Sequence, residues 1–470
     1  MPIDTVSFLM YNSITDMVSF GEVRFMKNKN VQIRNHILEL IESNQVKAGE
    51  RLPGARKIAK ELNVSFTHVQ AVVESLVQCG VLNAVSRSGT YVSEDWPDRL
   101  LPYNFFCYSG NRIKALADIV NPVCAANGLR LCRQFEQGFA EIRVSHYLLS
   151  HHNEYLDLSE IFRECFGDGR DFYMHVLKDF YINGRLCGLP IVFSPRVILY
   201  NVDVFKRCKC PIPRKDWTWD EFLDTIRYLK KHLPPDLIFN WENQIQSFTT
   251  FFVRAGGNLF DSANGFRPSF DDAAGLKAFE HYIELRDMLD ISCESDRYCE
   301  KFSRNEAAML FGVRQIMCHL NKFNPNYRAC AVKLPLFPGG RDVNIHGADL
   351  LCFRKSCTDA ELVKKLVKSI LSEKIQDMVA GSHYGIPFRK SSAAKGLDPK
   401  SCYDSVFMEE IPKISAAYNI FTPEIYRMIR IGFSRICSMS KREIAGEVRD
   451  LAGAVNVMMT LNEFEKNNSI

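Results

Sequence analysis

The sequence predicts a multi-domain protein, with a small N-terminal winged helix-turn-helix (α+β) followed by a much larger α/β domain. Between residues 46 and 92, two short helical patterns precede a hairpin pattern, and from about residue 100 onward strand and helix patterns alternate. The chain has 470 residues, of which 46% are hydrophobic, so it is long enough for two or three domains with separate cores.

The N-terminal module is expected to contain three amphipathic helices. The first has apolar residues at three- and four-residue spacing, namely Ile33, Ile37, Leu40 and Ile41. The second spans residues 56–62 and is interrupted by Asn63-Val64. Ser65 is suited to N-cap the third helix, whose buried stripe would be Val69, Val72, Val73, Leu76 and Val77. The last two helices and the turn between them predict a helix-turn-helix.

A hairpin is expected to follow the third helix. Residues 81–82 and 90–92 have strand character, and they flank the turn signal Arg87-Ser88-Gly89. Three helices followed by such a hairpin make a winged helix. The exposed N-terminal end of the third helix and the hairpin would then supply the DNA contacts, for which the candidates are Arg56, Ser65, Phe66, Thr67, His68, Gln70, Arg87 and Gly89.

The charge of this module is compatible with DNA but does not require it. Between residues 26 and 92 there are nine basic and five acidic residues, a surplus of 9 − 5 = +4, which equals the formal net charge of the whole chain. The remainder is therefore balanced, as in a domain with a different kind of partner. An ordinary small helical subdomain would show the same charge and the same periodicity.

The module resembles the winged helix-turn-helix of GntR-type regulators. The resemblance covers roughly 65 residues and is carried by Gly49, Leu52-Pro53, Arg56, Ala59, Ser65, Thr67, Val69, Leu76, Gly80 and Gly89-Thr90. Four positions depart from that family, which usually has Ser-Glu at Gly54-Ala55 and Arg at Phe66 and Gln70. Two missing arginines remove expected phosphate or guanine contacts, so the operator sequence cannot be transferred and a modest affinity is expected.

The rest of the chain has an α/β pattern. Residues 101–108 and 129–135 are expected to be strands on either side of a helix at 112–126, which is a β-α-β unit. Further strands are expected at residues 196–200 and 329–332, and further helices at 218–233, 271–289 and 359–372. Thr218 with Glu221 forms a capping box, which makes Trp217 and Trp219 packing residues rather than ligand contacts.

Residues 100–460 resemble the extracellular solute-binding proteins of the sugar-binding type (family 1), the capture subunits of ABC importers. Six motifs occur in the family's order: GRLCGLP at 184–190, LYNVDVF at 199–205, WTWDEF at 217–222, AGGNLFD at 255–261, FSRNEAAMLFG at 302–312 and YGIPFRKS at 384–391. The resemblance implies a periplasmic-binding-protein-like fold of two α/β lobes that close on a ligand. The strands at 197–200 and near 343–351 would cross between the lobes.

Candidate ligand residues lie on expected loops at strand ends. Sugar sites combine aromatic faces with planar polar groups, and the candidates of these kinds are Phe193, Ser194, Trp241, Arg314, His346, Asp349 and Tyr384. Arg314 stands close to a point where sugar-binding relatives commonly have Trp. An arginine there would suit the carboxylate or sulfate of an acidic sugar, and it would equally suit a surface ion pair.

Composition and termini favour a cytoplasmic protein without a metal or cofactor. The N-terminus lacks the features of a secretory signal, and no apolar run approaches the roughly 20 residues of a membrane helix. The 16 cysteines include no C-x-x-C pair, so we expect reduced structural thiols. Residues 1–25 are expected to be a tail upstream of a native start at Met26, the DNA-binding domain to span 26–95, and a second tail to span 461–470.

Together these features predict a one-component transcriptional regulator that is not an enzyme. It would bind operator DNA as a homodimer and a carbohydrate effector in the interlobe cleft. Three alternatives remain at this point: a ligand-binding interaction protein with degenerate DNA recognition, a LacI-type sensor, and an enzyme fused to the DNA module. For the last of these, the sequence offers no Schiff-base context, G-x-S-x-G elbow or phosphate loop.

Overall fold

The computed structural model divides into two compact units. The N-terminal unit ends at Glu94, and the large unit begins at Asp95 and also takes in Cys79–Val81. The residues described are 29–78, 80–96, 99, 105–108, 113–132, 138–240, 245–261, 267–289, 295–355, 357, 359–415 and 422–468. The expected tail at residues 1–25 lies outside these ranges, as does the end of the tail expected at 461–470.

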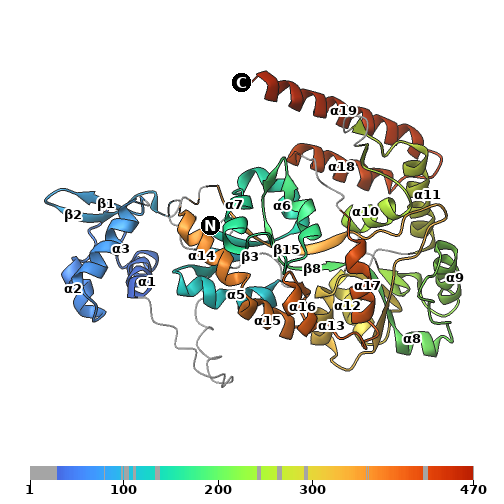
Figure 1. Cartoon of the computed structure of the whole chain (residues 1–470), viewed down its shortest axis with the longest axis horizontal. Coiled ribbons are helices and arrows are strands. Elements are labelled where there is room, and N and C mark those ends of the chain that lie inside the picture. The colour runs from blue at the N-terminus through green and yellow to red at the C-terminus, as the bar shows by residue number, and fades with distance from the viewer. Residues whose placement is uncertain are drawn as a thin grey trace. The chain divides into compact units, whose positions relative to one another are not determined.

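The N-terminal unit has three helices and a hairpin (Figure 1, blue). Its elements are α1 (Lys29–Glu42), α2 (Ala55–Glu61), α3 (Phe66–Gln78), β1 (Leu82–Val85) and β2 (Gly89–Val92). The expected apolar stripes form its core, because Ile33, Ile37, Ile41, Val69 and Leu76 are all buried. Of the other four members, Val72 is buried and Leu40, Val73 and Val77 are half-buried, and Leu38, which was not expected in the stripe, is buried as well. The predicted helix-turn-helix is therefore confirmed.

The hairpin is the predicted wing. β1 and β2 are antiparallel, with Leu82 opposite Val92, and residues 50–52 add a short third segment along β2. In that segment Leu52 N donates to Thr90 O at 2.8 Å. The turn between the strands contains Arg87 at φ 62° and Gly89 at φ 133°. Such left-handed backbone suits the expected turn residues.

The first lobe of the large unit is built on a six-stranded mixed sheet. The strand order is β16-β8-β15-β5-β3-β4, and the bounds are β3 (Phe105–Tyr108), β4 (Arg130–Cys132), β5 (Ala140–Val144), β8 (Leu189–Pro195), β15 (His346–Phe353) and β16 (Ile386–Pro387). Its helices are α5 (Lys114–Ala126), α6 (Ser145–His151), α7 (Ser159–Phe166), α14 (Ala360–Ile370), α15 (Glu373–Gly381) and α16 (Lys390–Gly396). β3 is parallel to β4 across α5, which confirms the predicted β-α-β unit.

Short elements complete this lobe between α6 and β8. They are η1 (His152–Glu154), η2 (Met174–Phe180) and the hairpin of β6 (Tyr181–Ile182) with β7 (Arg185–Leu186). Two of the expected strands run partly outside the described residues. Of 101–108 only β3 is described, and of 129–135 the described strand is β4.

The second lobe has a four-stranded sheet in the order β10-β13-β9-β14. Its strands are β9 (Val197–Asn201), β10 (Phe239–Asn240), β13 (Met309–Gly312) and β14 (Ala329–Val332), and β11 (Phe260–Asp261) pairs separately with β12 (Arg267–Pro268). Its helices are α8 (Val202–Arg207), α9 (Trp219–Leu229), α10 (Ile245–Arg254), α11 (Ala273–Met288), α12 (Ser295–Ser303) and α13 (Gln315–Phe323), with the short η3 (Pro235–Leu237). α9 begins at the predicted Thr218–Glu221 capping box, and Trp217 and Trp219 are buried, as expected of packing residues.

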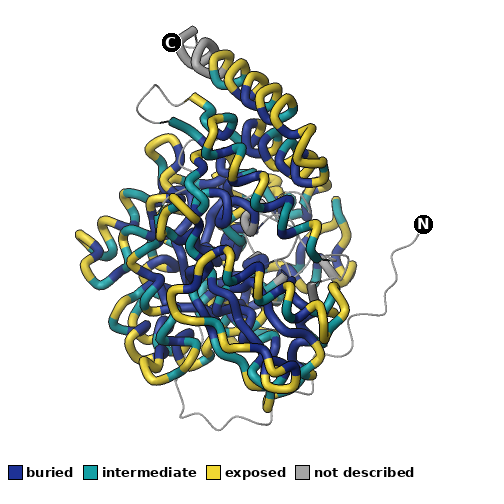
Figure 2. The backbone as a smooth tube through the Cα atoms, turned by 90° about the vertical axis from the view of Figure 1, so that its right-hand side faces the viewer, coloured by how far each residue is buried: buried dark blue, intermediate teal, exposed yellow. Residues whose placement is uncertain are grey.

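Three chain segments connect the lobes. β8 passes through Arg196 into β9, and β14 returns through residues 333–345 to β15, as the resemblance implied. The third connection leaves α16 and contains α17 (Asp404–Glu410) and η4 (Ile411–Lys413) before α18 (Pro423–Ile436). The chain ends with α19 (Ile444–Asn468), which packs on α18 and turns one side to solvent (Figure 2).

One expectation about the cysteines is wrong. Cys330 on β14 and Cys402, just before α17, form a disulfide, whereas the sequence analysis expected reduced thiols. The two residues are 72 positions apart, so no local spacing marks the pair. Within the described ranges, no helix combines the length and the apolar character needed to span a membrane.

Candidate functional site

The first turn of α3 presents the expected DNA-contacting side chains. The Ser65 hydroxyl accepts a hydrogen bond from His68 N at 3.3 Å, which is the predicted N-cap, and it also contacts Thr67 Oγ1 at 2.9 Å and His68 Nδ1. Phe66 is 41% exposed, and Thr67, His68 and Gln70 are exposed as well. The capping bonds fix the start of the helix, so these side chains project from a rigid end.

Arg56 lies next to this turn. Its guanidinium carbon is 6.0 Å from the centre of the Phe66 ring, a cation–π contact between α2 and α3. Phe66 occupies a position where GntR-type regulators usually have Arg. The contact therefore keeps a positive charge beside the end of α3, although that charge comes from the preceding helix.

The wing places its candidates on the exposed turn. Arg87 is exposed, and the Ser88 and Tyr91 hydroxyls are 2.6 Å apart. A Cβ at Gly89 would lie 2.5 Å from Arg51 Nε, so the glycine lets a further arginine lie against the wing. All eight expected DNA-contacting residues are thus exposed or half-exposed in the N-terminal unit.

In the large unit, a buried asparagine joins the three interlobe connections. The Asn344 side chain accepts from Arg196 N at 2.9 Å and donates to Arg196 O at 2.8 Å, which fixes the first connection to the second. The same amide donates to Glu410 Oε2 at 2.8 Å, and Asn344 N donates to Lys413 O at 2.9 Å. The hinge between the lobes is therefore a hydrogen-bonded structure rather than three loose strands.

Arg314 is a second link between the lobes. It precedes α13 in lobe 2 and is 1% exposed. Its guanidinium donates to both carboxylate oxygens of Asp404, at 2.7 and 3.2 Å, and to the carbonyls of Gly385 at 2.6 Å and Gly396 at 2.9 Å. Each of its three nitrogens thus donates to a protein acceptor. In this arrangement the guanidinium of Arg314 is not available to bind the acidic sugar that the sequence analysis considered.

Phe193 and Ser194 also belong to the packed hinge. Phe193 is fully buried on β8, and its ring packs edge-on against Tyr173 at 5.0 Å. The Ser194 hydroxyl donates to Pro195 O at 2.7 Å and accepts from Arg314 N at 2.9 Å. Both side chains already have protein partners.

Asp349 and Tyr384 form one buried pair. The Tyr384 hydroxyl donates to Asp349 Oδ2 at 3.0 Å, and Gln315 at the start of α13 also hydrogen-bonds the carboxylate. Burial raises the pKa of Asp349 to about 6. The two hydrogen bonds act in the opposite direction and lower this pKa, but burial has the larger effect. Asp349 and Tyr384 belong to lobe 1, whereas Gln315 belongs to lobe 2. The hydrogen bond between Gln315 and Asp349 is therefore another interlobe contact.

His346 is the first residue of β15. Burial lowers the pKa of its imidazole to about 3, and the positive charges of Arg196 and His175 act in the same direction. Its Nδ1 is 3.5 Å from Asp179 Oδ2, and its ring lies edge-on to Phe180 at 5.5 Å. The ring is therefore neutral at pH 7, and the contact with Asp179 is not an ion pair.

These candidates were expected on loops at strand ends, but Phe193 and Ser194 lie within β8, and His346 and Asp349 lie within β15. Trp241 lies outside the described residues. Sequence reasoning missed Asn344, Gln315, Asp404 and Glu410, which supply the polar hinge contacts. A buried hinge asparagine has no local sequence signature, and Arg314 and Asp404 are 90 positions apart.

A two-lobed α/β unit with three interlobe connections, preceded by a winged helix on the same chain, is the architecture of a solute-binding protein joined to a DNA-binding module. The model of the family described as "Bacterial extracellular solute-binding protein" matches residues 145–402, which is more than half of the chain. The chain belongs to that family. Residues 29–92 match "Bacterial regulatory proteins, gntR family", so the N-terminal unit is a GntR-type DNA-binding domain. These are regulatory and binding domains, not catalytic ones.

Solved structures show the same fold at low sequence identity. An ABC transporter solute-binding protein from Thermotoga lettingae TMO, bound with alpha-D-tagatose, has a TM-score of 0.62 at 17% identity, and the match covers 76% of this chain and 99% of that one. The acarbose-binding GacH receptor of Streptomyces glaucescens GLA.O has a TM-score of 0.61 at 14% identity, with the same two coverages. Lmo0181 from Listeria monocytogenes, in complex with cycloalternan, has those same values. No curated protein sequence matches the chain.

Proposed function

We propose that this protein is a ligand-responsive transcriptional regulator, which binds duplex DNA through α3 and the wing and a carbohydrate between its two lobes. One observation carries the proposal: a GntR-type domain and a solute-binding domain stand on the same chain. A capture subunit of an importer has no use for a DNA-binding module, whereas a sensor needs both parts. Because the proposed partner is duplex DNA, we expect the protein to act inside the cell.

Strand order supports a position for the effector. In parallel α/β sheets, ligands bind at the carboxyl ends of strands. The segments after β3, β4 and β10 are residues 109–112, 133–137 and 241–244, all outside the described residues. We propose that the effector cleft lies at the carboxyl ends of β3, β4 and β10, with Trp241 as the ring-stacking residue. The engaged state of Arg314 favours a neutral carbohydrate over an acidic one.

The hinge supplies a route from effector to DNA. Closure of the lobes on a ligand would reorganise the polar contacts of Asn344, Arg314 and Asp349, which join the connections in the present arrangement. One winged helix reads only a half-site, so we propose a homodimer on a palindromic site. Ligand binding would then change how the two winged helices are spaced.

The effector part is tested by thermal shift with neutral, uronic and sulfated sugars. A solute bound only by the native state raises the melting temperature of the large unit. The proposal expects a specific neutral sugar to do so, with the shift lost in Trp241→Ala. A response to non-sugar solutes alone would contradict the carbohydrate assignment.

The DNA part is tested by selection from random-sequence duplexes. Enrichment of two inverted half-sites whose centres lie about 10 base pairs apart, or a multiple of that spacing, is the expected result for a dimer of winged helices. No enriched sequence, together with the absence of salt-dependent retention on DNA, would favour a ligand-controlled interaction protein whose DNA recognition is degenerate. This alternative is motivated by Phe66 and Gln70, which stand where the family usually has Arg.

Single arginine variants separate specific from general electrostatic effects. Removing one phosphate contact lowers the slope of log affinity against log salt by about 0.9. Arg56→Ala should show this change. Arg297→Ala is the matched control, because it removes the same charge from an exposed position on α12 of the large unit and should leave the slope unchanged. Equal slopes in both variants would remove Arg56 from the DNA interface.

A further inference from the structure

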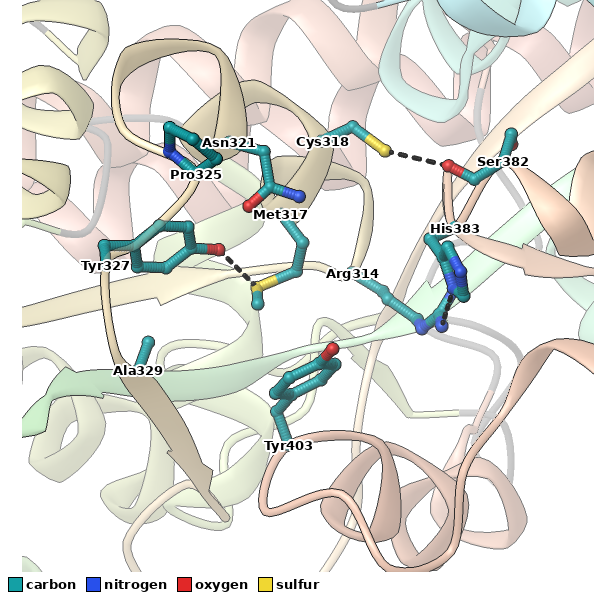
Figure 3. Close-up of a pocket in the computed structure, with 10 residues that line it drawn as sticks. All are labelled: Arg314, Met317, Cys318, Asn321, Pro325, Tyr327, Ala329, Ser382, His383 and Tyr403. Atoms are coloured by element: carbon teal, nitrogen blue, oxygen red, sulfur yellow. Dashed lines mark hydrogen bonds between the residues drawn. The ribbon is translucent and has the colours of Figure 1, made fainter.

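A cavity of about 350 Å³ lies at the hinge, bounded by elements of both lobes (Figure 3). We call it the hinge-side cavity. Lobe 2 contributes α13 and the start of β14, lobe 1 contributes the turn between α15 and β16, and the third connection contributes the residue before α17. The lining residues are Arg314, Met317, Cys318, Asn321, Pro325, Tyr327, Ala329, Ser382, His383 and Tyr403.

The hinge-side cavity is separate from the position proposed above for the effector cleft, and in this respect the inference rests on the proposed function. In the lobe 1 sheet, β16 is one edge strand, whereas β3 and β4 are at the opposite edge. Four strand spacings separate β16 from β3, which is about 19 Å. In lobe 2, β14 beside the cavity and β10 beside the cleft are likewise opposite edges. A ligand in the cavity would therefore occupy a second site.

Several polar groups that face the cavity have hydrogen-bonding capacity left over. His383 Nδ1 accepts from Arg314 Nη2 at 3.5 Å, which leaves the proton on Nε2 as a donor. The Tyr327 hydroxyl donates to the thioether sulfur of Met317 at 3.8 Å, and such a sulfur is a weak acceptor. Among the described residues, the Asn321 amide and the Tyr403 hydroxyl make no hydrogen bond to the protein; Asn321 and His383 are exposed and Tyr403 is half-exposed, so the cavity opens to solvent. These four groups come from three different segments and converge on one space (Figure 3).

The cavity is also electrically neutral and partly aromatic. Arg314 is neutralised by Asp404, so its charge is not available to select an anion. The rings of Tyr327 and Tyr403, with Met317 and Pro325, provide apolar surface beside the polar groups. Aromatic rings next to amide and hydroxyl groups suit a molecule with C–H patches and many hydroxyls. The volume is near the lower end for ligand pockets and suits one sugar ring rather than an oligosaccharide.

We propose that the hinge-side cavity binds a neutral polyhydroxylated molecule of monosaccharide size, at a second site distinct from the effector cleft. Such a ligand would bridge lobe 2 at Asn321 and Tyr327 to lobe 1 at His383. Since it contacts both lobes, its affinity depends on their relative position, and it biases lobe closure. The Cys330–Cys402 disulfide fastens the segment of Tyr403 to β14, which fixes that wall of the cavity.

The first test locates binding by thiol protection. Cys318 lines the cavity, while Cys165 lies on α7 of lobe 1, and both are half-exposed free cysteines. The full-length protein is alkylated with iodoacetamide in the presence of D-glucose, D-galactose, D-mannose, D-fructose or myo-inositol at millimolar concentration, and labelling is followed by peptide mass mapping. At least one probe should slow the labelling of Cys318 severalfold and leave that of Cys165 unchanged. No protection by any of the five probes overturns the proposal.

The second test uses variants and titration calorimetry with the protecting probe. Asn321→Leu and Tyr403→Phe each remove one hydrogen-bonding group, so each should weaken binding about tenfold. Asn326→Leu is the matched control, because Asn326 is an exposed residue nearby that does not line the cavity. Binding should persist in Trp241→Ala, which alters the proposed cleft. Binding lost in Trp241→Ala but kept in Asn321→Leu and Tyr403→Phe would assign the probe to the cleft and overturn the second site.

Discussion

Arg314 and Asp404 form an ion pair that is almost completely removed from water. Their side chains are 2% and 4% exposed, and the guanidinium has further acceptors in two carbonyl groups. A buried charge is costly unless it is paired and hydrogen-bonded, as here. The pair therefore does more to fix one arrangement of the lobes than to raise stability, since an apolar pair of similar volume would also fill the space.

Removing one partner of this pair should be far more damaging than removing both. Arg314→Met leaves the Asp404 carboxylate buried without its counter-ion, and we expect a loss of about 3–5 kcal/mol in the free energy of unfolding. The double variant Arg314→Met/Asp404→Leu should recover most of that loss. Urea unfolding of the large unit measures both.

The exposed pair of Arg328 and Asp203 is the matched control. The Arg328 side chain is 59% exposed, so Arg328→Met should change unfolding little. A similar loss in Arg314→Met and Arg328→Met would contradict the role given to the buried pair.

Asp349 should make the stability of the large unit depend on pH between about 4 and 6. Burial raises the pKa of the folded state from 3.8 to about 6, so the folded protein holds this proton more tightly than the unfolded chain. Stability is therefore greatest below the unfolded pKa and falls as pH rises through the folded one, by about 3 kcal/mol in total.

Asp349→Asn isolates this contribution. The amide oxygen can still accept from Tyr384, but it does not titrate, so we expect a flatter dependence of unfolding free energy on pH in that window. Asp168→Asn changes an exposed carboxylate and should leave the wild-type dependence intact. The explanation is wrong if the wild-type protein and Asp349→Asn show parallel curves from pH 4 to 6.

At the scale of elements, local signals predicted most of what is seen. Caps marked where α3 and α9 begin, apolar spacing marked the buried faces of α1 and α3, and the strand expected at 329–332 is β14. These features depend on residues within a few positions of each other. The third interlobe connection was not predicted, because α17 is short and its buried Asp404 is explained only by Arg314, 90 positions earlier.

Gly89 should be required for the form of the wing. Its φ of 133° is a conformation that side chains disfavour, so Gly89→Val should destabilise the N-terminal unit by about 1–3 kcal/mol. We expect weaker DNA retention as well, because the wing turn carries Arg87. Both effects are measured by thermal unfolding and by retention on a DNA column.

Gly54→Ala provides the comparison. Gly54 N-caps α2 at a φ of −59°, and an added Cβ would meet nothing within 4 Å. This variant should keep both the fold of the N-terminal unit and its DNA retention. Loss of retention in both glycine variants would mean that the wing geometry is not the cause.

For the whole molecule, the sequence indicated the two kinds of domain. The structure shows which hydrogen bonds and ion pairs fix the two lobes relative to each other. The sequence analysis expected the ligand residues on loops at strand ends, but Phe193 and Ser194 lie within β8, and His346 and Asp349 lie within β15. In addition, Phe193, Ser194, Arg314, Asp349 and Tyr384 contact the protein itself. Whether such a polar side chain binds solute or another side chain depends on which distant segment packs against it. A single sequence does not contain that information.

If the protein is a regulator, its two binding events must affect each other equally. A sugar that changes DNA affinity by a given factor must have its own affinity changed by the same factor when DNA is bound, because the two routes around the cycle have equal free energy. For an effective regulator we expect a factor of about 5–150, or 1–3 kcal/mol. Calorimetric titration of the effector is made with and without the selected operator, and DNA anisotropy is made with and without the effector.

The control for this coupling is a shuffled duplex of the same length. It should bind weakly by charge alone and leave the sugar affinity unchanged. Equal sugar affinity with operator and with shuffled duplex would show two domains that share a chain without communicating. A matched change in both titrations would instead show that the hinge transmits ligand binding to the DNA-binding unit.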